Sequence, residues 1–541
     1  MRTVVVLFLA SAVALAGGAD KAQKLLDKKA YAKAEAAARK LVEADAANID
    51  AWLVLADAMV GQADSLEGWE QQGKVSAAAE ALEAIVEKQD KDALVPLKLG
   101  DLYVKLAELM LRLTGKDNDV QGYYSDAVRM YTTALERDAK SADAEYGLGY
   151  VIYFSGKGAD KAREHIDKAL GLNKDHAKAH ALQAEIFRRD KNYTAAANSY
   201  EIARKLDDSN PLTCLYYAYS LWASGDKDGT PDAYFYTIKR HPDYAAAVRA
   251  YVSSLHKGDY TKAVPDLQKW TEKIKDSAPL WFYLGWGQSL LKQHPESYGA
   301  FEKAAKLAPQ NSEYVFRMGL ARESDGKADG ALKLYRKALK LDGAHEMAAA
   351  RFEGLIRMAG DIDKAEKLYE ELIKLAPQNG LVQNNYAFIL RNWAERRGAM
   401  AKQPPTNLRQ RIKRSSEVYE MSAANLPDDP QIQSDTGLLF EFYPCNRDDD
   451  KAIKYFTRSL DLSKYLYRDA FDGLTRLCRR TERWELLYDY ADGVVGAIDG
   501  GGHAIAPVGG SEPRELPAET PGLKARAVKA MQQAEPHLKE E

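Results

Sequence analysis

Cysteine is scarce in this sequence, and its scarcity excludes a fold built on disulfides. The 541 residues include three cysteines, Cys214, Cys445 and Cys478. A small, odd number cannot form a disulfide framework and leaves at least one thiol unpaired or intermolecular. No spacing matches a CxxC redox pair or a zinc site. Cys214 is expected in the core. A bond between Cys445 and Cys478, which lie about one repeat apart, stays open because sequence cannot test its geometry.

The sequence also lacks a large net charge, and it lacks catalytic motifs. The formal net charge is -3, so the chain has no global field for nucleic acid or an anionic membrane, and an electrostatic partner must meet a local patch. His345-Glu346 begins like the zinc motif HExxH, but Ala349 stands where the second histidine is required. No phosphate-binding loop is present. The sequence therefore predicts no enzyme, no cofactor, no metal and no nucleic-acid partner.

Long apolar runs are absent except at the start, where the sequence reads MRTVVVLFLASAVALAGGAD. Arg2 precedes an apolar run from Val4 to Leu15, and small residues follow, which is the pattern of a secretory signal. The run is too short for a comfortable membrane span. We expect cleavage near Ala14-Leu15-Ala16 or Ala19 and export to a bacterial periplasm or the extracellular space, with no stable membrane span afterwards. An uncleaved N-terminal anchor is the alternative.

A repeat is the strongest positive signal. In the stretch from Ala278 to Asn311, large apolar residues fall at helical spacing in two stripes, one through Trp281 and Leu284 and one through Phe301 and Leu307. The same pattern begins again at Ser312 and at Glu346, so the period is about 34 residues. One short helical hairpin cannot bury its own apolar face, and each copy must lean on the next. The sequence predicts an all-α array of tandem hairpins.

This pattern resembles the tetratricopeptide repeat family, and the resemblance recurs in register over most of the chain. The residues that carry it stand where that family places its signature residues: Trp281, Leu284, Gly285, Phe301, Ala304 and Pro309. Gly285 and Gly319 are expected to receive large residues at helix crossings, and Pro309 and Pro377 are expected to end second helices, because proline cannot donate an amide hydrogen bond. The resemblance implies a right-handed α-solenoid.

Composition and breaks in the register divide the chain. Insertions around 61–74 and 113–122 should lengthen helices or loops on one edge, since the stacking surfaces stay intact. The predicted segments are a signal peptide at 1–19, N-terminal units with insertions at 20–141, a regular array at 142–390, a basic insertion at 391–416, C-terminal units at 417–495, and a Gly/Pro-rich flexible tail with a short terminal helix at 496–541.

A second stripe on the first helices provides the candidate binding site. The resemblance implies that first helices line a concave face, where aromatic rings suit recognition of an extended peptide or a helix of a partner protein. The rings at these positions are Tyr146, Tyr150, Tyr153, Tyr219, Trp222, Phe282, Trp286 and Phe316. The alternative is that several of them pack between hairpins.

Arginines occupy corresponding positions elsewhere. Arg188, Arg189 and Arg249 could hold a carboxylate or phosphate of a partner through paired donors, although a solvated basic rim is the commoner outcome. The family's Lys and Asn clamp for a C-terminal carboxylate is not matched, because Asn384 and Asn385 lack accompanying lysines. The basic insertion at 391–416 is either a docking edge for an acidic surface or an extended helical hairpin with solvated charges.

These observations predict an exported scaffold that binds peptide or helical segments of partner proteins in an aromatic-lined groove. A noncatalytic structural subunit of a cell-envelope assembly or secretion complex is the alternative.

Overall fold

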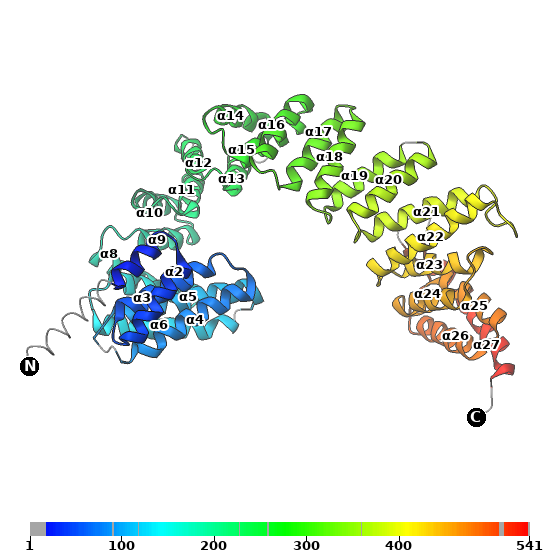
Figure 1. The fold of residues 1–541 in the computed structure, drawn as a ribbon, viewed down its shortest axis with the longest axis horizontal. Coiled ribbons are helices and arrows are strands. Elements are labelled where there is room, and N and C mark those ends of the chain that lie inside the picture. The colour runs from blue at the N-terminus through cyan, green and yellow to red at the C-terminus, as the bar shows by residue number, and fades with distance from the viewer. Residues whose placement is uncertain are drawn as a thin grey trace, which may run out of the picture. The chain divides into compact units, whose positions relative to one another are not determined.

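The computed structural model describes residues 18–88, 91–116, 118–226, 228–256, 259–358, 360–507 and 513–538. It forms two compact units, Met1–Leu280 and Trp281–Glu541, and each is described by itself. Within each unit the helices follow one another as packed hairpins (Figure 1), so the predicted all-α repeat fold is confirmed. The predicted signal region at 1–17 lies outside the described residues. None of the helices described is both long and apolar enough to cross a bilayer.

The first unit begins with a helix over residues 18–27. The helices that follow are α2 (Tyr31–Ala44), α3 (Ile49–Ala63), α4 (Gly68–Val86), α5 (Leu94–Thr114), α6 (Asn118–Arg137), α7 (Ala142–Phe154), α8 (Ala159–Leu172), α9 (Ala177–Arg189), α10 (Tyr193–Leu206), α11 (Pro211–Ser224), α12 (Gly229–Arg240), α13 (Ala245–His256) and α14 (Tyr260–Lys273). The two predicted insertions lengthen helices: α4, α5 and α6 have 19, 21 and 20 residues, whereas α7 and α8 have 13 and 14.

Helix α15 (Ala278–Leu290) begins in the first unit and continues in the second. The second unit contains α16 (His294–Leu307), α17 (Ser312–Ser324), α18 (Ala328–Leu341), α19 (Glu346–Arg357), α20 (Ile362–Leu375), α21 (Gly380–Glu395), α22 (Thr406–Asn425), α23 (Pro430–Phe442), α24 (Asp449–Leu462), α25 (Arg468–Thr481), α26 (Trp484–Asp499), strands β1 (Ile505–Pro507) and β2 (Pro513–Glu515), and α27 (Thr520–Ala534).

The repeated segment LAPQN ends one helix and starts the next. Helix α16 ends at Leu307, two residues before Pro309, and α20 ends two residues before Pro377. The asparagine of each segment caps the following helix: Asn311 accepts a hydrogen bond from the backbone N–H of Tyr314, and Asn379 does the same for α21. Such a cap contributes about 1 kcal/mol. The prediction that these prolines end the second helices is confirmed.

The distance between the two helices of a hairpin is set where a glycine on one helix contacts an aromatic ring on the other. A β-carbon at Gly285 would lie 2.9 Å from Phe301, and one at Gly319 would lie 2.7 Å from Cδ1 of Tyr335 and nearer still to its Cε1. Only glycine allows these helices to approach so closely. Another buried ring makes a polar contact across its hairpin: the hydroxyl of Tyr369 donates a hydrogen bond to Glu353 over 3.1 Å.

Some rings are shared by two hairpins. The ring of Tyr131 on α6 would lie 2.7 Å from a β-carbon at Gly100 on α5 and 2.5 Å from one at Gly147 on α7. Phe456 on α24 lies in the same way between Gly437 and Gly473. One side chain therefore spaces both its own hairpin and the next.

The basic insertion is less solvated than expected. Helix α21 continues to Glu395, a turn follows, and α22 begins directly after Pro405. Arg411 pairs with Asp363 at 2.5 Å and also with Glu366, while Arg414 Nε lies 2.7 Å from Glu370. The expectation of solvated charges is wrong for these two arginines, because α22 packs them against acidic residues of α20.

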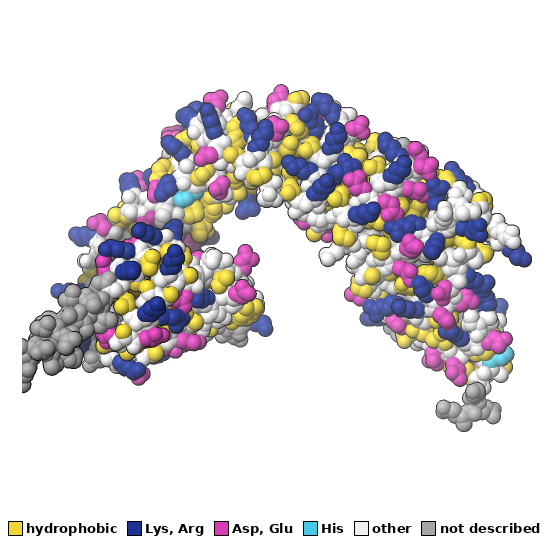
Figure 2. All heavy atoms as spheres, viewed as in Figure 1, with side chains coloured by type: hydrophobic (Ala, Val, Ile, Leu, Met, Phe, Trp, Pro, Cys, Tyr) yellow, Lys and Arg dark blue, Asp and Glu magenta, His cyan; other side chains and the backbone are white. Residues whose placement is uncertain are grey.

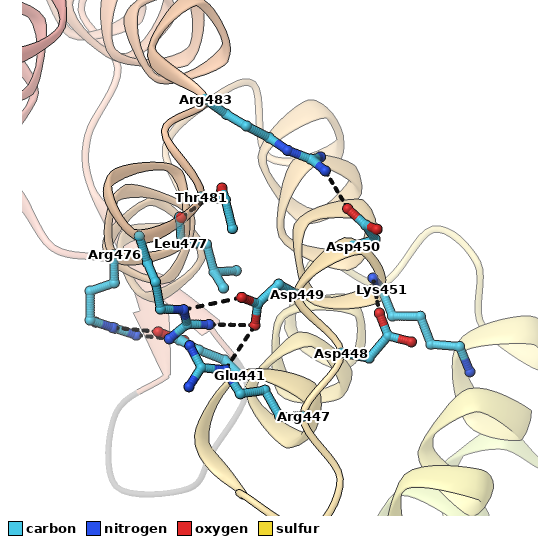
Figure 3. A network of polar contacts seen from close by, with 11 residues as sticks. Glu441, Arg447, Asp448, Asp449, Asp450, Lys451, Arg476, Leu477, Thr481 and Arg483 are labelled. Carbon is cyan, nitrogen blue, oxygen red and sulfur yellow. Dashed lines mark hydrogen bonds and ion pairs between the residues drawn. The ribbon is translucent and has the colours of Figure 1, made fainter.

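Ion pairs also link successive hairpins near the end of the second unit (Figure 3). Arg476 on α25 makes two hydrogen bonds, 2.7 and 2.9 Å, to the buried Glu441 on α23. Asp449 on α24 accepts from Arg447 at 3.1 Å and from Arg480 on α25 at 2.5 Å. In this part of the chain, arginine guanidinium groups are therefore commonly paired with carboxylates.

In the described part of the predicted tail at 496–541, the structure has two short strands and a terminal helix, α27. The strands β1 and β2 pair antiparallel, with Ile505 opposite Glu515. Helix α27 buries Leu523 and Ala527 in one apolar cluster with Leu487 and Ala491 of α26. Its alanine-rich stripe fits the small residues of α26, and apolar burial compensates for the ordering of the Gly/Pro-rich connection.

All three cysteines are free thiols in the structure. Cys214 and Cys478 are buried, as expected for Cys214, and Cys445 is exposed. The Cys445–Cys478 bond that the sequence left open is not formed.

Candidate functional site

A groove of about 580 Å³ lies in the first unit, between α7, α9 and α11. Three of the predicted residues line it: Tyr146, Tyr150 and Arg189. The first helices of three successive hairpins therefore line one groove.

One wall of the groove is a row of rings on α7. Tyr146, Tyr150 and Phe154 stand four residues apart, so they share one face of the helix. The ring centroids of Tyr146 and Tyr150 are 6.1 Å apart, and those of Tyr150 and Phe154 are 4.5 Å apart. Phe154 is 41% exposed, which is high for a large apolar side chain. Tyr146 and Tyr150 are half-buried, so Phe154 provides most of the exposed apolar surface of the row.

The phenols in this wall are held neutral. Burial raises the pKa of Tyr150 far above its usual value, and the Glu108 carboxylate, which accepts its hydroxyl hydrogen bond over 2.5 Å, raises it further. Burial and the nearby acids Asp101 and Glu108 raise the pKa of Tyr146 as well. Both rings therefore stay protonated, and the bond to Glu108 fixes the orientation of Tyr150.

The floor of the groove is formed by small residues of α9. Ala177 and Ala181 lie one helical turn apart and face the cavity, together with the exposed Lys178. A larger side chain at Ala181 would occupy the space between the rings of α7 and Tyr216 on α11. The alanines are therefore what leaves the groove open.

Glu185 is the centre of a charged cluster at one end of the groove. It accepts two hydrogen bonds of 2.8 Å from Arg188, one of 2.8 Å from Arg189 and one of 3.0 Å from Tyr200. Burial alone would raise the pKa of Glu185, but the hydrogen bonds from Arg188 and Arg189 outweigh it and the pKa is lowered. The carboxylate therefore stays ionised and holds both guanidinium groups in place.

The same cluster corrects the expectation for Arg188. Its paired donors are occupied by Glu185, and its guanidinium carbon lies 4.6 Å from the ring centroid of Tyr216. Arg188 thus braces α9 against α11 and does not offer a free fork to a partner. Arg189 uses only its Nε for Glu185 and keeps a 61% exposed side chain in the groove lining.

The loop before α11 closes the other end of the groove through Asp207, Ser209 and Asn210. Asp208 fixes this loop, because it accepts hydrogen bonds from Arg240 over 2.9 Å and from Tyr236 over 2.6 Å. The bond from Arg240 and then that from Tyr236 lower the pKa of Asp208 to about 2.

The other predicted residues of the first unit lie outside the groove. Tyr153 is half-buried beside it, 5.8 Å from the Arg189 guanidinium carbon. Tyr219 and the exposed Trp222 form a separate cluster on α11, with centroids 5.4 Å apart. Arg249 is exposed on α13 and does not line the groove.

In the second unit, two of the predicted rings are core residues. Phe282 and Phe316 are 8% and 2% exposed, so the prediction that they line an accessible surface is wrong. Phe282 is covered by Phe301 of the same hairpin and by Tyr314 of the next, with centroids 5.7 and 4.9 Å away. Trp286 is half-buried beneath the guanidinium of Arg317, 4.3 Å from its ring centroid.

Sequence reasoning missed Phe154, Lys178 and Tyr216, which also line the groove. Phe154 continues the four-residue spacing of Tyr146 and Tyr150, so extending the stripe by one turn would have found it. Lys178 and Tyr216 belong to neighbouring hairpins, and their approach depends on the packing. Within the described ranges, no three His, Cys, Asp or Glu side chains are grouped as metal ligands.

A family model agrees with the repeat architecture. The tetratricopeptide repeat family model matches residues 153–211, 293–346 and 316–380, and the first of these segments includes α9 and α10 of the groove. The crystal structure of a thermophilic TPR protein of Thermus thermophilus is similar, with 19% identity and a TM-score of 0.32 over 38% of this chain and 98% of that one.

Two curated relatives are members of complexes by name. BBSome complex member BBS4 of Bos taurus is 24% identical over 290 residues, which is 52% of this chain and 54% of the relative. Superkiller complex protein 3 of Homo sapiens is 26% identical over 332 residues, which is 59% of this chain and 20% of the relative. The chain thus spans about half the length of the first and a fifth of the second.

Proposed function

Since the chain is a tetratricopeptide repeat protein, we propose that it is a noncatalytic scaffold that binds a peptide or helical segment of a partner protein in the groove between α7, α9 and α11. The observation that carries the proposal is the row of Tyr146, Tyr150 and Phe154 above an alanine floor. Aromatic side chains provide a large contact area at low entropic cost.

The charges of the groove favour recognition by shape over recognition by net charge. Lys178 and Arg189 are balanced by Glu185 and Asp207 in the lining. Arg189, which is held by Glu185, orients a polar group of the partner, while the rings and alanines bury its apolar side chains. Binding here should therefore depend only weakly on ionic strength, because screening acts on exposed net charge.

Photo-crosslinking tests this proposal. A benzophenone amino acid replaces Phe154 in one variant and Phe388 in a matched control; these phenylalanines are 41% and 44% exposed, and Phe388 lies on α21 of the other unit. We expect a defined partner adduct at position 154 that disappears when Ala181→Trp fills the groove, with helix content by circular dichroism unchanged. Equal adducts at both positions, or an adduct that survives the tryptophan, would place the site elsewhere.

A second candidate role is that of a structural subunit of a cell-envelope assembly or secretion complex. The names of the relatives, a BBSome member and a superkiller complex protein, favour a complex subunit. Native mass spectrometry of the purified protein distinguishes the roles: one stoichiometric partner supports a subunit, whereas exchangeable adducts at position 154 support a scaffold.

We further propose that the chain is exported, on the strength of Arg2 followed by the apolar run Val4–Leu15. Intact-mass analysis after expression in a bacterium with a periplasm should find a chain that begins after Ala16 or Ala19. A full-length chain in the membrane fraction would instead support the uncleaved anchor, and a full-length chain in the cytosol would refute export.

A further inference from the structure

A second cavity, of about 540 Å³, lies within the second unit where α19, α20 and α21 meet. Its apolar wall consists of Ile356, Ile362 and Ile389, with Trp393 beside them. Helix α21 has 16 residues, whereas α17 and α19 have 13 and 12, so its extra turn builds one side of the cavity. The extra turn leads into the basic insertion, whose role the groove of the first unit does not explain.

Three arginines line this cavity: Arg357, Arg396 and Arg397. Asp361 is the acidic residue of the lining, and its carboxylate caps α20 by accepting the backbone N–H of Asp363 over 3.0 Å. Arg357 lies 3.8 Å from Glu353, but that carboxylate already accepts hydrogen bonds from Tyr369 and Asn385. The cavity therefore has an excess of positive charge.

Two arginines of the cavity, Arg396 and Arg397, differ from most others of the same unit. Arg411, Arg414 and Arg476 meet carboxylates through two nitrogens each, whereas Arg396 and Arg397 meet no carboxylate among the described residues. On the face drawn in Figure 2, basic and acidic side chains are interspersed over the surface. Neighbouring guanidinium groups without acids repel one another, and an anionic partner removes that cost.

Trp393 is fixed at the edge of the cavity. The guanidinium carbons of Arg397 and Arg411 lie 3.9 and 4.0 Å from its ring centroid, and Arg411 is itself anchored on Asp363 and Glu366. Arg397 Nη1 also donates to the backbone carbonyl of Trp393 over 3.3 Å. The ring is therefore preorganised, which lowers the entropic cost of binding against it.

We propose that this cavity binds an acidic segment of a partner protein. Carboxylates of the segment pair with Arg357, Arg396 and Arg397, and an apolar side chain between them packs against Ile362 and Ile389. The occupant is argued from charge complementarity: the lining offers planar donor forks, which match carboxylates, together with an apolar wall. This surface is separate from the groove of the first unit, so it does not depend on the function proposed there.

Fluorescence anisotropy with the full chain tests the proposal. The probe is a fluorescein-labelled peptide of alternating leucine and glutamate, and the control is the same peptide with glutamine in place of glutamate. We expect the glutamate peptide to bind, and Arg396→Glu/Arg397→Glu to weaken it about tenfold or more, since each charge-assisted pair is lost. Affinity should fall as salt is raised.

Matched charge reversals on α19 separate the cavity from diffuse electrostatics. Arg357→Glu should weaken binding, whereas Arg351→Glu, on the same helix but outside the cavity and 57% exposed, should not. Equal losses in both variants, or equal binding of the glutamine peptide, would overturn the proposal. Circular dichroism checks that each variant is folded.

Two further outcomes would assign the cavity to another occupant. Tighter binding of a single-stranded oligonucleotide than of the glutamate peptide would overturn the peptide assignment in favour of nucleic acid. Concentration-dependent self-association in sedimentation that Arg396→Glu/Arg397→Glu abolishes would assign the surface to a second copy of this chain. The crosslink at position 154 should be unchanged in these variants, so the two proposals can fail separately.

Discussion

Gly319→Ala should destabilise the second unit although alanine is the better helix former. The new β-carbon would lie 2.7 Å from Cδ1 of Tyr335, well inside van der Waals contact. The ring cannot move away, because it is fully buried against Phe316 and its hydroxyl is bonded to Glu323. Overpacking of this kind costs about 1–3 kcal/mol, whereas alanine gains about 0.5–1 kcal/mol of helix propensity. Because the overlap is with a ring that cannot move, the cost should lie in the upper part of that range, about 2–3 kcal/mol, and the net loss should be about 1–2.5 kcal/mol.

Gly299→Ala is the matched control. Gly299 lies inside α16, and a β-carbon there would meet nothing within 4 Å, so only the helix propensity changes and the variant should gain about 0.5–1 kcal/mol. Urea unfolding followed by far-UV circular dichroism measures the midpoints. Because repeat arrays can unfold in parts, hydrogen exchange of the α17 and α16 amides gives the local free energies. An unchanged or raised midpoint for Gly319→Ala would refute the argument that the ring requires glycine.

Three other outcomes follow from burial and pKa shifts. The pKa of Asp208 is about 2 in the folded protein, against the usual 3.8. Its contribution to folding stability is therefore fully present above pH 3.8 and is lost as the pH falls through 2. Asp208→Asn should lower the urea midpoint above this pH range, and the difference from wild type should vanish below it. Cys445 alone should react with a disulfide reagent in the folded protein, because Cys214 and Cys478 are buried and burial raises the pKa of Cys478 to about 12. After unfolding, three thiols should react in total. A single reactive thiol in the unfolded protein would reveal a disulfide. Leu523→Ala should cost about 2–5 kcal/mol and speed hydrogen exchange in α27, since this side chain is fully buried; unaltered protection would mean that α27 does not need the contact.

The repeat could be predicted because its signals are local. Helical spacing, the LAPQN breaks and the small Gly285 at a helix crossing all lie within one period, and the structure confirms each of them. The lengthened α4, α5 and α6 followed from the position of the insertions between stacking surfaces.

The composition of the site was harder to predict because it depends on contacts between repeats. Helical spacing gives the angular position of Phe282 but not its cover, and Tyr314 of the next hairpin buries it. The pairing of Arg188 with Glu185 is three residues apart and could have been anticipated from the helix alone. Whether binding uses the aromatic wall remains a prediction for the crosslinking experiment.

The end of the chain shows how much depends on contacts between helices. The sequence predicted a flexible Gly/Pro-rich segment and a short terminal helix, and in the structure Leu523, Ala527 and Ala530 of α27 lie in one apolar cluster with Leu487 and Ala491 of α26. The stripe on α27 was visible in the sequence. Its docking required knowing that α26 leaves a complementary stripe uncovered.

The rings shared by two hairpins make the geometry of the array adjustable at single positions. Phe456 is the spacer both for Gly437 in its own hairpin and for Gly473 in the next, so any change in the size of that one side chain tilts two neighbours at once. Curvature in such a protein can thus evolve by exchanging one ring, without insertions and without altering the residues that meet a partner. The shape of a binding surface built from successive hairpins can thus change through buried residues that do not contact the partner.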